Sequence, residues 1–208
     1  MVPNSDGICY LIARVFDDDG NGIYASNVFE AIDWAVSEGA NVINMSLGAR
    51  TNYQAGQAAT AAAHEQGAVI VSSAGNSGSE YLQYPASYNH VLSVAAVDAD
   101  GARASFSQYN KKVDVAAPGV AIRSTYIGGR YASLSGTSMA APHVAGAIAK
   151  VWSVCRQCSN AQVESCLLTA ASSSSKRTNE LGFGIVNAAD TYDCLVNTSG
   201  CCHEEAES

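Results

Sequence analysis

The sequence predicts one α/β domain built around a mostly parallel β-sheet. Two observations point to it: short, nearly continuous apolar runs alternate with longer stretches of helical periodicity, and apolar residues make up 48% of the 208 residues. Strands that are apolar on both faces are typical of parallel sheets that helices cover on both sides. Only 14% of the residues are charged, which argues against disorder. One domain is the expectation for this length.

The expected elements alternate along the chain as such a fold requires. Strands are expected over residues 10–16, 42–47, 68–74 and 91–97, and helices over residues 27–36, 54–66, 138–154 and 160–170. The first helix presents Val28, Ala31, Ile32 and Ala35 on one face. Gly39 follows it, and glycine is favoured just past a helix end.

Two segments between these elements have the composition of loops. Residues 17–22 combine three aspartates with two glycines and an asparagine, and they predict a turn. The aspartates are interpreted as a solvated loop; a calcium loop is the alternative, although the EF-hand spacing is missing. The four serines at residues 172–175 predict a flexible loop.

The charge balance excludes several classes of protein. Eleven Lys and Arg stand against 19 Asp and Glu, so the net charge is −8. Nucleic-acid binders concentrate Lys and Arg, so no nucleic-acid partner is expected. No run of about 20 apolar residues is present, so no membrane partner or membrane span is expected. The first residues also lack the basic and apolar regions of a signal peptide.

Seven cysteines point to a secreted, disulfide-containing protein. Six of them follow residue 150, and the odd total leaves one thiol unpaired or paired outside the chain. Cys155 and Cys158 have CxxC spacing, but the best candidates for further zinc ligands are Cys201, Cys202 and His203. That set is irregular for zinc, and a CxxC at a helix end does not fit a redox motif. Disulfides are therefore preferred, and a glycosylation sequon at residues 197–199 fits the same compartment.

Three motifs carry the chemistry. They are Gly-Thr-Ser-Met-Ala-Ala-Pro-His-Val-Ala-Gly at residues 136–146, Ser-Ala-Gly-Asn-Ser-Gly at residues 73–78, and Val-Ile-Asn-Met-Ser-Leu-Gly at residues 42–48. With these motifs the chain resembles the subtilisin-like serine proteases, the subtilases, from Pro3 to about Asp190. The resemblance implies the subtilisin-like three-layer fold with a mostly parallel sheet, incomplete at its N-terminal side.

The resemblance also assigns the catalytic residues. Ser138 begins a predicted helix, whose N-terminal N–H groups favour negative charge, as a nucleophile that creates an oxyanion requires. A serine N-cap would explain Ser138 equally well without the surrounding motif. By resemblance Ser138 is the nucleophile, and Asn76 is the side-chain donor of the oxyanion hole. An α/β-hydrolase elbow is disfavoured, because Ala140 stands where that motif needs glycine.

Binding roles follow from the same resemblance. Ser46, Leu47 and Gly48 form the edge that pairs with an extended polypeptide substrate, Ala74, Gly75 and Asn76 wall the primary specificity pocket, and Ser77 and Gln83 lie at its rim and floor. Neither Ser77 nor Gln83 is charged, which suggests that a charged side chain is not strictly selected. The chemistry itself requires no cofactor. A structural calcium or other cation could be held by the carbonyls of Ala86, Tyr88 and Val91 with Asp114; a turn carboxylate is an equal interpretation of Asp114.

The family's catalytic Asp and His motifs are absent from these residues. The histidines are His64, His90, His143 and His203, and none has the expected context. We therefore expect residues 1–196 to be a partial subtilase catalytic domain and residues 197–208 a polar, Cys-containing, loosely held tail. The missing N-terminal portion or a propeptide is a possible partner. The alternatives are a serine endopeptidase that lacks its base here, or an inactive pseudoenzyme that binds peptides. A nucleotide-binding domain is set aside, because no phosphate-binding glycine motif is present.

Overall fold

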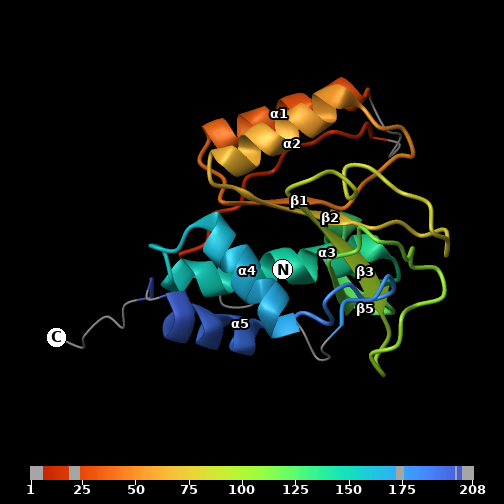
Figure 1. Ribbon diagram of the computed structural model, residues 1–208. Coiled ribbons are helices and arrows are strands. Elements are labelled where there is room, and N and C mark those ends of the chain that lie inside the picture. The colour runs from red at the N-terminus through yellow and green to blue at the C-terminus, as the bar shows by residue number, and fades with distance from the viewer. Residues whose placement is uncertain (1–6, 19–23, 172–175, 200, 203–208) are drawn as a thin grey trace.

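The computed structural model describes residues 7–18, 24–171, 176–199 and 201–202, and these form three layers (Figure 1). Helices α1 (Ala25–Ser37) and α2 (Gln54–Glu65) cover one face of a sheet. Helix α3 (Thr137–Val154) covers the other face, and α4 (Asn160–Ala171) and α5 (Ala188–Cys194) pack outside it. The predicted α/β class and three-layer arrangement are confirmed.

The sheet consists of four parallel strands. These are β1 (Val42–Met45), β2 (Val69–Ser73), β3 (Val91–Val97) and β4 (Val115–Pro118), in that spatial order. Asn44 pairs with Val71, and Val94 pairs with Val115. Because all four strands run the same way, their carboxyl ends meet at one edge, on the right in Figure 1. In open α/β sheets this is the edge where ligands bind.

Alternate residues of the buried strands enter two different cores, as the period of two in a strand requires. Val69 and Val71 face α3, where they meet Val144 and Ile148 in the larger core. Ile70 faces the other way and joins the smaller core beneath α1 and α2. This two-sided burial explains why β2 and β3 are continuous apolar runs in the sequence.

The predicted helices and the strands near residues 42, 68 and 91 are all present within a few residues of the expected bounds. The elements not foreseen are β4, the hairpin of β5 (Ile122–Tyr126) and β6 (Arg130–Leu134), α5, a 3₁₀ turn (Ile127–Gly129) and a short π-helix (Leu195–Ser199). Both hairpin strands are largely exposed on both faces, so they lack the alternation that would reveal them. The expected loop at 172–175 and most of the aspartate turn at 17–22 lie outside the described residues.

The expected strand over residues 10–16 is wrong. No strand forms there, and β1 lies at the edge of the sheet with β2 as its partner. Most of the segment is exposed, so water can satisfy its backbone groups. Val15 and Phe16 line an apolar cavity beside α1, and of residues 10–16 Phe16 alone forms a β-bridge, an isolated one. β-branched and aromatic residues pack well on an apolar surface whether or not a strand forms, so the composition of residues 10–16 did not by itself specify strand pairing.

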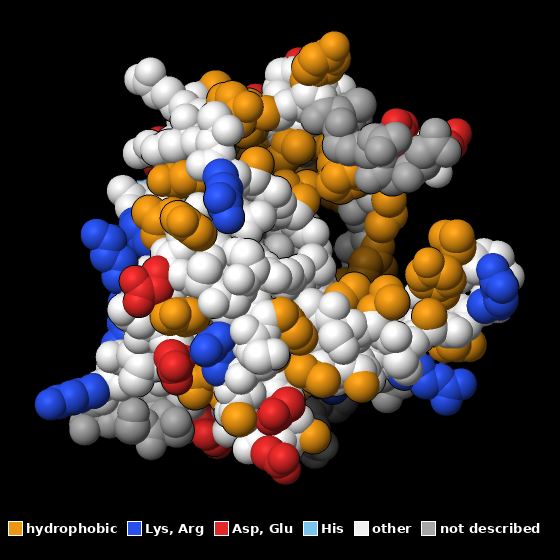
Figure 2. All heavy atoms as spheres, turned by 90° about the vertical axis from the view of Figure 1, so that its right-hand side faces the viewer, with side chains coloured by type: hydrophobic (Ala, Val, Ile, Leu, Met, Phe, Trp, Pro, Cys, Tyr) orange, Lys and Arg blue, Asp and Glu red, His pale blue; other side chains and the backbone are white. Residues whose placement is uncertain are grey.

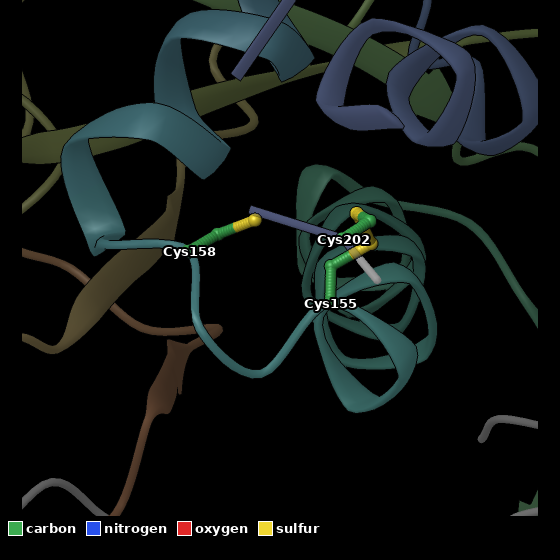
Figure 3. A group of neighbouring side chains, drawn as sticks. All are labelled: Cys155, Cys158 and Cys202. Carbon is green, nitrogen blue, oxygen red and sulfur yellow. A yellow bond between two sulfur atoms is a disulfide. The ribbon is translucent and has the colours of Figure 1, made fainter. Parts of the chain in front are cut away.

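Three disulfides hold the C-terminal part together. They join Cys155 to Cys202, Cys158 to Cys201 and Cys166 to Cys194, and Cys9 is an exposed free thiol. Figure 3 shows Cys202 bonded to Cys155 at the end of α3 and Cys158 on the following loop. The sulfur atoms of Cys155, Cys158 and Cys202 all form disulfides, which agrees with the preference for disulfides over zinc.

The segment after residue 197 is held more firmly than expected. Cys201 is buried, and with Cys202 it is tied to the end of α3. The expectation of a loose tail is therefore wrong as far as Cys202, because the cysteine partners were not known from the sequence. The domain boundary at residue 196 stays a prediction. Among the described helices, none is long and apolar enough to cross a membrane.

Candidate active site

Ser138 is the second residue of α3, at the carboxyl-end edge of the sheet. The first N–H groups of a helix have no partner within the helix, so this end favours negative charge. Ser46, just beyond β1, contacts Ser138 from the other side. Ser46 Oγ donates to the Ser138 carbonyl at 2.9 Å, and Ser138 Oγ donates to the Ser46 carbonyl at 3.3 Å. The predicted nucleophile and the predicted substrate edge are therefore in direct contact.

The Asn76 side chain is fixed by Thr137. Asn76 Oδ1 accepts hydrogen bonds from the Thr137 N–H and from Thr137 Oγ1, each at 2.8 Å. Thr137 Oγ1 in turn accepts from the Gly75 N–H at 3.1 Å. With Oδ1 occupied, the Asn76 amide is oriented, and its Nδ2 has no acceptor among the described residues. A preoriented amide donor beside a serine is the arrangement that stabilises an oxyanion.

A cavity of about 370 Å³ lies beside Ser138 and Asn76. Its lining includes most of the residues predicted for substrate binding, namely Leu47, Gly48, Gly75, Ser77 and Gln83. Ser46 and Ala74 do not line it; Ser46 is bonded to Ser138, and Ala74 is buried. The cavity thus collects side chains from three separate motifs.

The Gln83 side chain lies so close to Gly48 and Gly75 that neither position has room for a side chain. A Cβ added to Gly48 would lie 2.8 Å from Gln83 Cγ, and a Cβ added to Gly75 would lie 2.0 Å from Gln83 Oε1. Gly75 also has a φ of +112°, which side-chain-bearing residues rarely adopt. The cavity therefore has two backbone walls with the Gln83 amide between them.

Three lining residues had no binding role predicted from the sequence, namely Arg50, Ser73 and Gln108. Gln108 is buried; its Oε1 accepts from Ser77 Oγ at 2.8 Å, and its Nε2 donates to the Tyr81 carbonyl at 2.5 Å. It therefore holds the rim residue Ser77 in place. Gln108 directly follows an Ala-Ser-Phe-Ser run at residues 104–107, a segment for which no role was predicted. Nothing in the sequence places Arg50.

No imidazole contacts Ser138 in the described part of the chain. His143 Nδ1 hydrogen-bonds the Met139 carbonyl at 2.8 Å, one turn back along its own helix. His64 contacts Glu164 at 3.2 Å, and its ring lies against His90 with a centroid distance of 4.5 Å. His203 is outside the described residues. The described cavity lining contains no carboxylate either, so these residues supply no general base to Ser138.

Asp114 has partners other than a cation. Its Oδ2 accepts from the Ser93 N–H at 2.9 Å, and its Oδ1 lies 3.7 Å from Arg177 Nη2. Burial raises the pKa of this carboxyl, while the Ser93 hydrogen bond and Arg177 partly oppose the increase. A cation bound by Asp114 with the carbonyls of Ala86, Tyr88 and Val91 would have to compete with the Arg177 guanidinium. These neighbours fit a structural carboxylate better than a calcium ligand.

A second cavity, of about 250 Å³, adjoins the first and shares Leu47 and Gly48 with it. It is mainly apolar, with Val28, Phe29 and Tyr53 among its lining. An extended peptide that passes along Leu47 and Gly48 could place side chains in both cavities, since alternate side chains of a strand point the same way.

Comparison with known proteins agrees with this geometry. The sequence profile of the subtilase family matches residues 5–184. The chain is 46% identical over 151 residues to a thermostable alkaline protease of Halalkalibacterium halodurans, covering 73% of this chain and 41% of that protein. It is 42% identical over 175 residues to subtilisin BL of Lederbergia lenta, covering 84% and 64%. The chain thus spans about half the length of these relatives.

A solved structure extends the likeness to three dimensions. The chain matches the structure of a protease from Pseudoalteromonas arctica with a TM-score of 0.77 and 34% identity, covering 83% of this chain and 59% of the other. The fold that positions the serine cavity is therefore shared with a protease of known structure.

Proposed function

The chain belongs to the subtilase family, and from this premise we propose that it carries the nucleophile and oxyanion donors of a serine endopeptidase. The reaction is acyl transfer: Ser138 Oγ attacks a peptide carbonyl, and the Asn76 amide with the Ser138 N–H stabilises the resulting oxyanion. The observation that supports this most is the pair of 2.8 Å hydrogen bonds from Thr137, which orient the Asn76 amide beside Ser138.

The general base is proposed to come from outside these 208 residues. Ser138 Oγ donates to the Ser46 backbone carbonyl, which is not basic enough to remove the hydroxyl proton and so does not activate the serine. In subtilisin itself, a relative, removal of the histidine alone costs roughly 10⁶ in kcat, about as much as removal of all three triad residues. We therefore expect no efficient peptidase activity from this chain by itself. A polypeptide that carries an Asp and a His, supplied as the N-terminal portion of the domain, would complete the site.

The substrate is proposed to be a polypeptide in extended conformation. Residues 46–48 follow β1 and adjoin both cavities. Pairing of a peptide with this edge uses main-chain hydrogen bonds, while the cavities select side chains. A propeptide could occupy the same edge.

Secretion is the proposed compartment. Three disulfides among six cysteines favour an oxidising environment, in which such bonds form and persist.

The second candidate is a pseudoenzyme that binds peptides without cleaving them. The missing base favours it, whereas the maintained contact between Thr137 and Asn76 favours the enzyme, because binding alone needs no oriented oxyanion donor. The two candidates differ in what Ser138 can do when a base is supplied.

Chemical rescue separates them. The chain is incubated with a fluorophosphonate probe with and without added imidazole, and the labelled residue is identified by mass spectrometry. We expect slow labelling of Ser138 that imidazole accelerates, with no labelling in Ser138→Ala and unchanged labelling in Ser133→Ala, a loss of an exposed hydroxyl on β6. Equal labelling with and without imidazole, or labelling of other serines, would leave only the peptide-binding role.

A further inference from the structure

Arg50 is the single charged side chain among the described residues that line the Ser138 cavity. The other lining side chains are apolar or neutral, so the charge of a substrate side chain in this cavity would be read by Arg50. The Lys and Arg side chains on this face of the molecule are dispersed, so they form no basic patch (Figure 2).

Arg50 is exposed, and its guanidinium contacts an aromatic ring without being neutralised. Its Cζ lies 4.3 Å from the centroid of the Tyr81 ring, a cation–π contact. A contact of this kind leaves the N–H donors of the guanidinium available for a carboxylate. Within the described part of the chain, no carboxylate forms an ion pair with Arg50.

Gln83 offers a second donor in the same cavity. Its Nε2 lies 3.0 Å from the position of an added Cβ on Gly48, so the amide adjoins the wall along which the peptide would run. No described residue hydrogen-bonds the Gln83 side chain. A planar cation and a free amide facing one cavity are suited to a carboxylate, which accepts several hydrogen bonds at once.

We propose that Arg50, assisted by Gln83, makes this cavity selective for an acidic side chain, so that the site binds peptides with Glu or Asp next to the bond facing Ser138. This rests on the proposed function, whose substrate class it specifies. It also replaces the expectation drawn from Ser77 and Gln83 alone, which took no account of Arg50. The net charge of −8 opposes the approach of acidic peptides, so the preference has to come from a local cation, which Arg50 supplies.

The test is a binding measurement, because it does not require the absent base. The ¹⁵N-labelled chain is titrated with acetyl-Phe-Ala-Ala-Glu-amide and with the Gln and Lys counterparts, and Kd is obtained from chemical-shift changes. Glu and Gln have nearly the same shape, so their ratio isolates the charge. We expect the Glu peptide to bind about fivefold more tightly than the Gln peptide, as for a partly exposed ion pair.

Variants of Arg50 locate the origin of the preference. Arg50→Ala should abolish the Glu-over-Gln ratio, Arg50→Lys should retain part of it, and Arg50→Glu should reverse it in favour of Lys. Arg123→Ala is the matched control: Arg123 also stacks on a tyrosine, Tyr131, and its loss changes the net charge equally, but it lies on the hairpin and does not line the cavity. This control should keep the wild-type ratio.

Two failures are distinguishable. If all three peptides bind with equal affinity, or if Arg123→Ala lowers the ratio as much as Arg50→Ala, selection by Arg50 is wrong while peptide binding stands. If no peptide binds at millimolar concentration, the proposed function and the selectivity both fail.

Discussion

Thr137 holds Asn76 through two hydrogen bonds of 2.8 Å to the same oxygen, one from its backbone N–H and one from its hydroxyl. The residue before the nucleophile thus orients the donor that would stabilise the oxyanion. Because the hydroxyl also accepts from the Gly75 N–H at 3.1 Å, it links the end of β2 to the start of α3. Two adjacent residues of one motif therefore have complementary roles: Ser138 is the proposed nucleophile, and Thr137 orients Asn76, the proposed oxyanion donor.

Thr137→Val should therefore impair acylation more than binding. Valine keeps the shape of threonine but removes the hydroxyl contact, while the backbone N–H still reaches Asn76. Since complete loss of an oxyanion donor costs about 10²–10³ in rate, a loosened donor should slow imidazole-assisted labelling of Ser138 about tenfold. Peptide affinity should change little. Thr125→Val on β5 serves as the control, and equal labelling rates in both variants would show that the Thr137 hydroxyl has no positioning role.

Gly75→Ala should destabilise the fold and close the cavity. The new Cβ would meet Gln83 Oε1 at 2.0 Å and Gln108 Oε1 at 2.1 Å, at a φ of +112°. Gly39→Ala is a matched control, because Gly39 has a φ of +82° with nothing within 4 Å of its added Cβ. Strain alone should cost Gly39→Ala about 1 kcal/mol, and strain plus collision should cost Gly75→Ala about 3 kcal/mol. Urea unfolding measures both, and equal losses would mean that Gln83 and Gln108 move aside freely.

The sequence was most informative where function and chain order coincide. Ser138 and Asn76 could be predicted, because each lies in a contiguous motif at the end of an element whose periodicity is visible. Arg50 and Gln108 could not, because their places in the cavity arise only when loops after β1 and β3 fold against each other. The strand prediction for residues 10–16 was wrong because composition does not specify a packing partner. The apolar, β-rich residues indicated contact with an apolar surface, but that surface is a cavity beside α1, which Val15 and Phe16 line, and not a neighbouring strand.

Glu164 should make stability depend on pH in the acidic range. Burial raises the pKa of this carboxyl above 4.5, and contact with His64 and the nearby His90 partly opposes the increase. A carboxyl whose pKa is higher in the folded state contributes stability below its unfolded pKa, and that contribution is lost as pH rises through the folded pKa. Glu164 Oε1 is also buried without a hydrogen-bond partner, so ionisation is costly.

Glu164→Gln should therefore flatten the decline in unfolding free energy as the pH rises from the ordinary glutamate pKa, near 4.5, through the raised pKa of the folded state. Denaturant unfolding at several pH values measures it, with the exposed Glu80→Gln as the control for loss of one charge. Parallel pH profiles for wild type and Glu164→Gln would contradict the assignment.

Calcium should leave the thermal unfolding midpoint unchanged. Arg177 Nη2 lies 3.7 Å from Asp114 Oδ1 and also donates to the Lys111 and Val113 carbonyls at 2.7 and 2.6 Å, so the cation position at Asp114 is taken by a fixed guanidinium. Removal of metal with a chelator should likewise have no effect on unfolding. A calcium-dependent increase in wild type that disappears in Asp114→Asn would instead support the cation site expected from the sequence.

Two of the disulfides should be largely redundant with each other. The Cys155–Cys202 bond closes a loop of 47 residues that encloses the 43-residue loop of Cys158–Cys201. A crosslink stabilises mainly by restricting the unfolded chain, by about 4 kcal/mol for a loop of this size. Either bond alone imposes almost the same restriction, so replacing one pair by alanines should cost far less than that. Replacing both pairs should cost nearly the full amount. Urea unfolding of the two double variants and the quadruple variant checks this, and additive losses would show that each bond acts through its own native contacts instead.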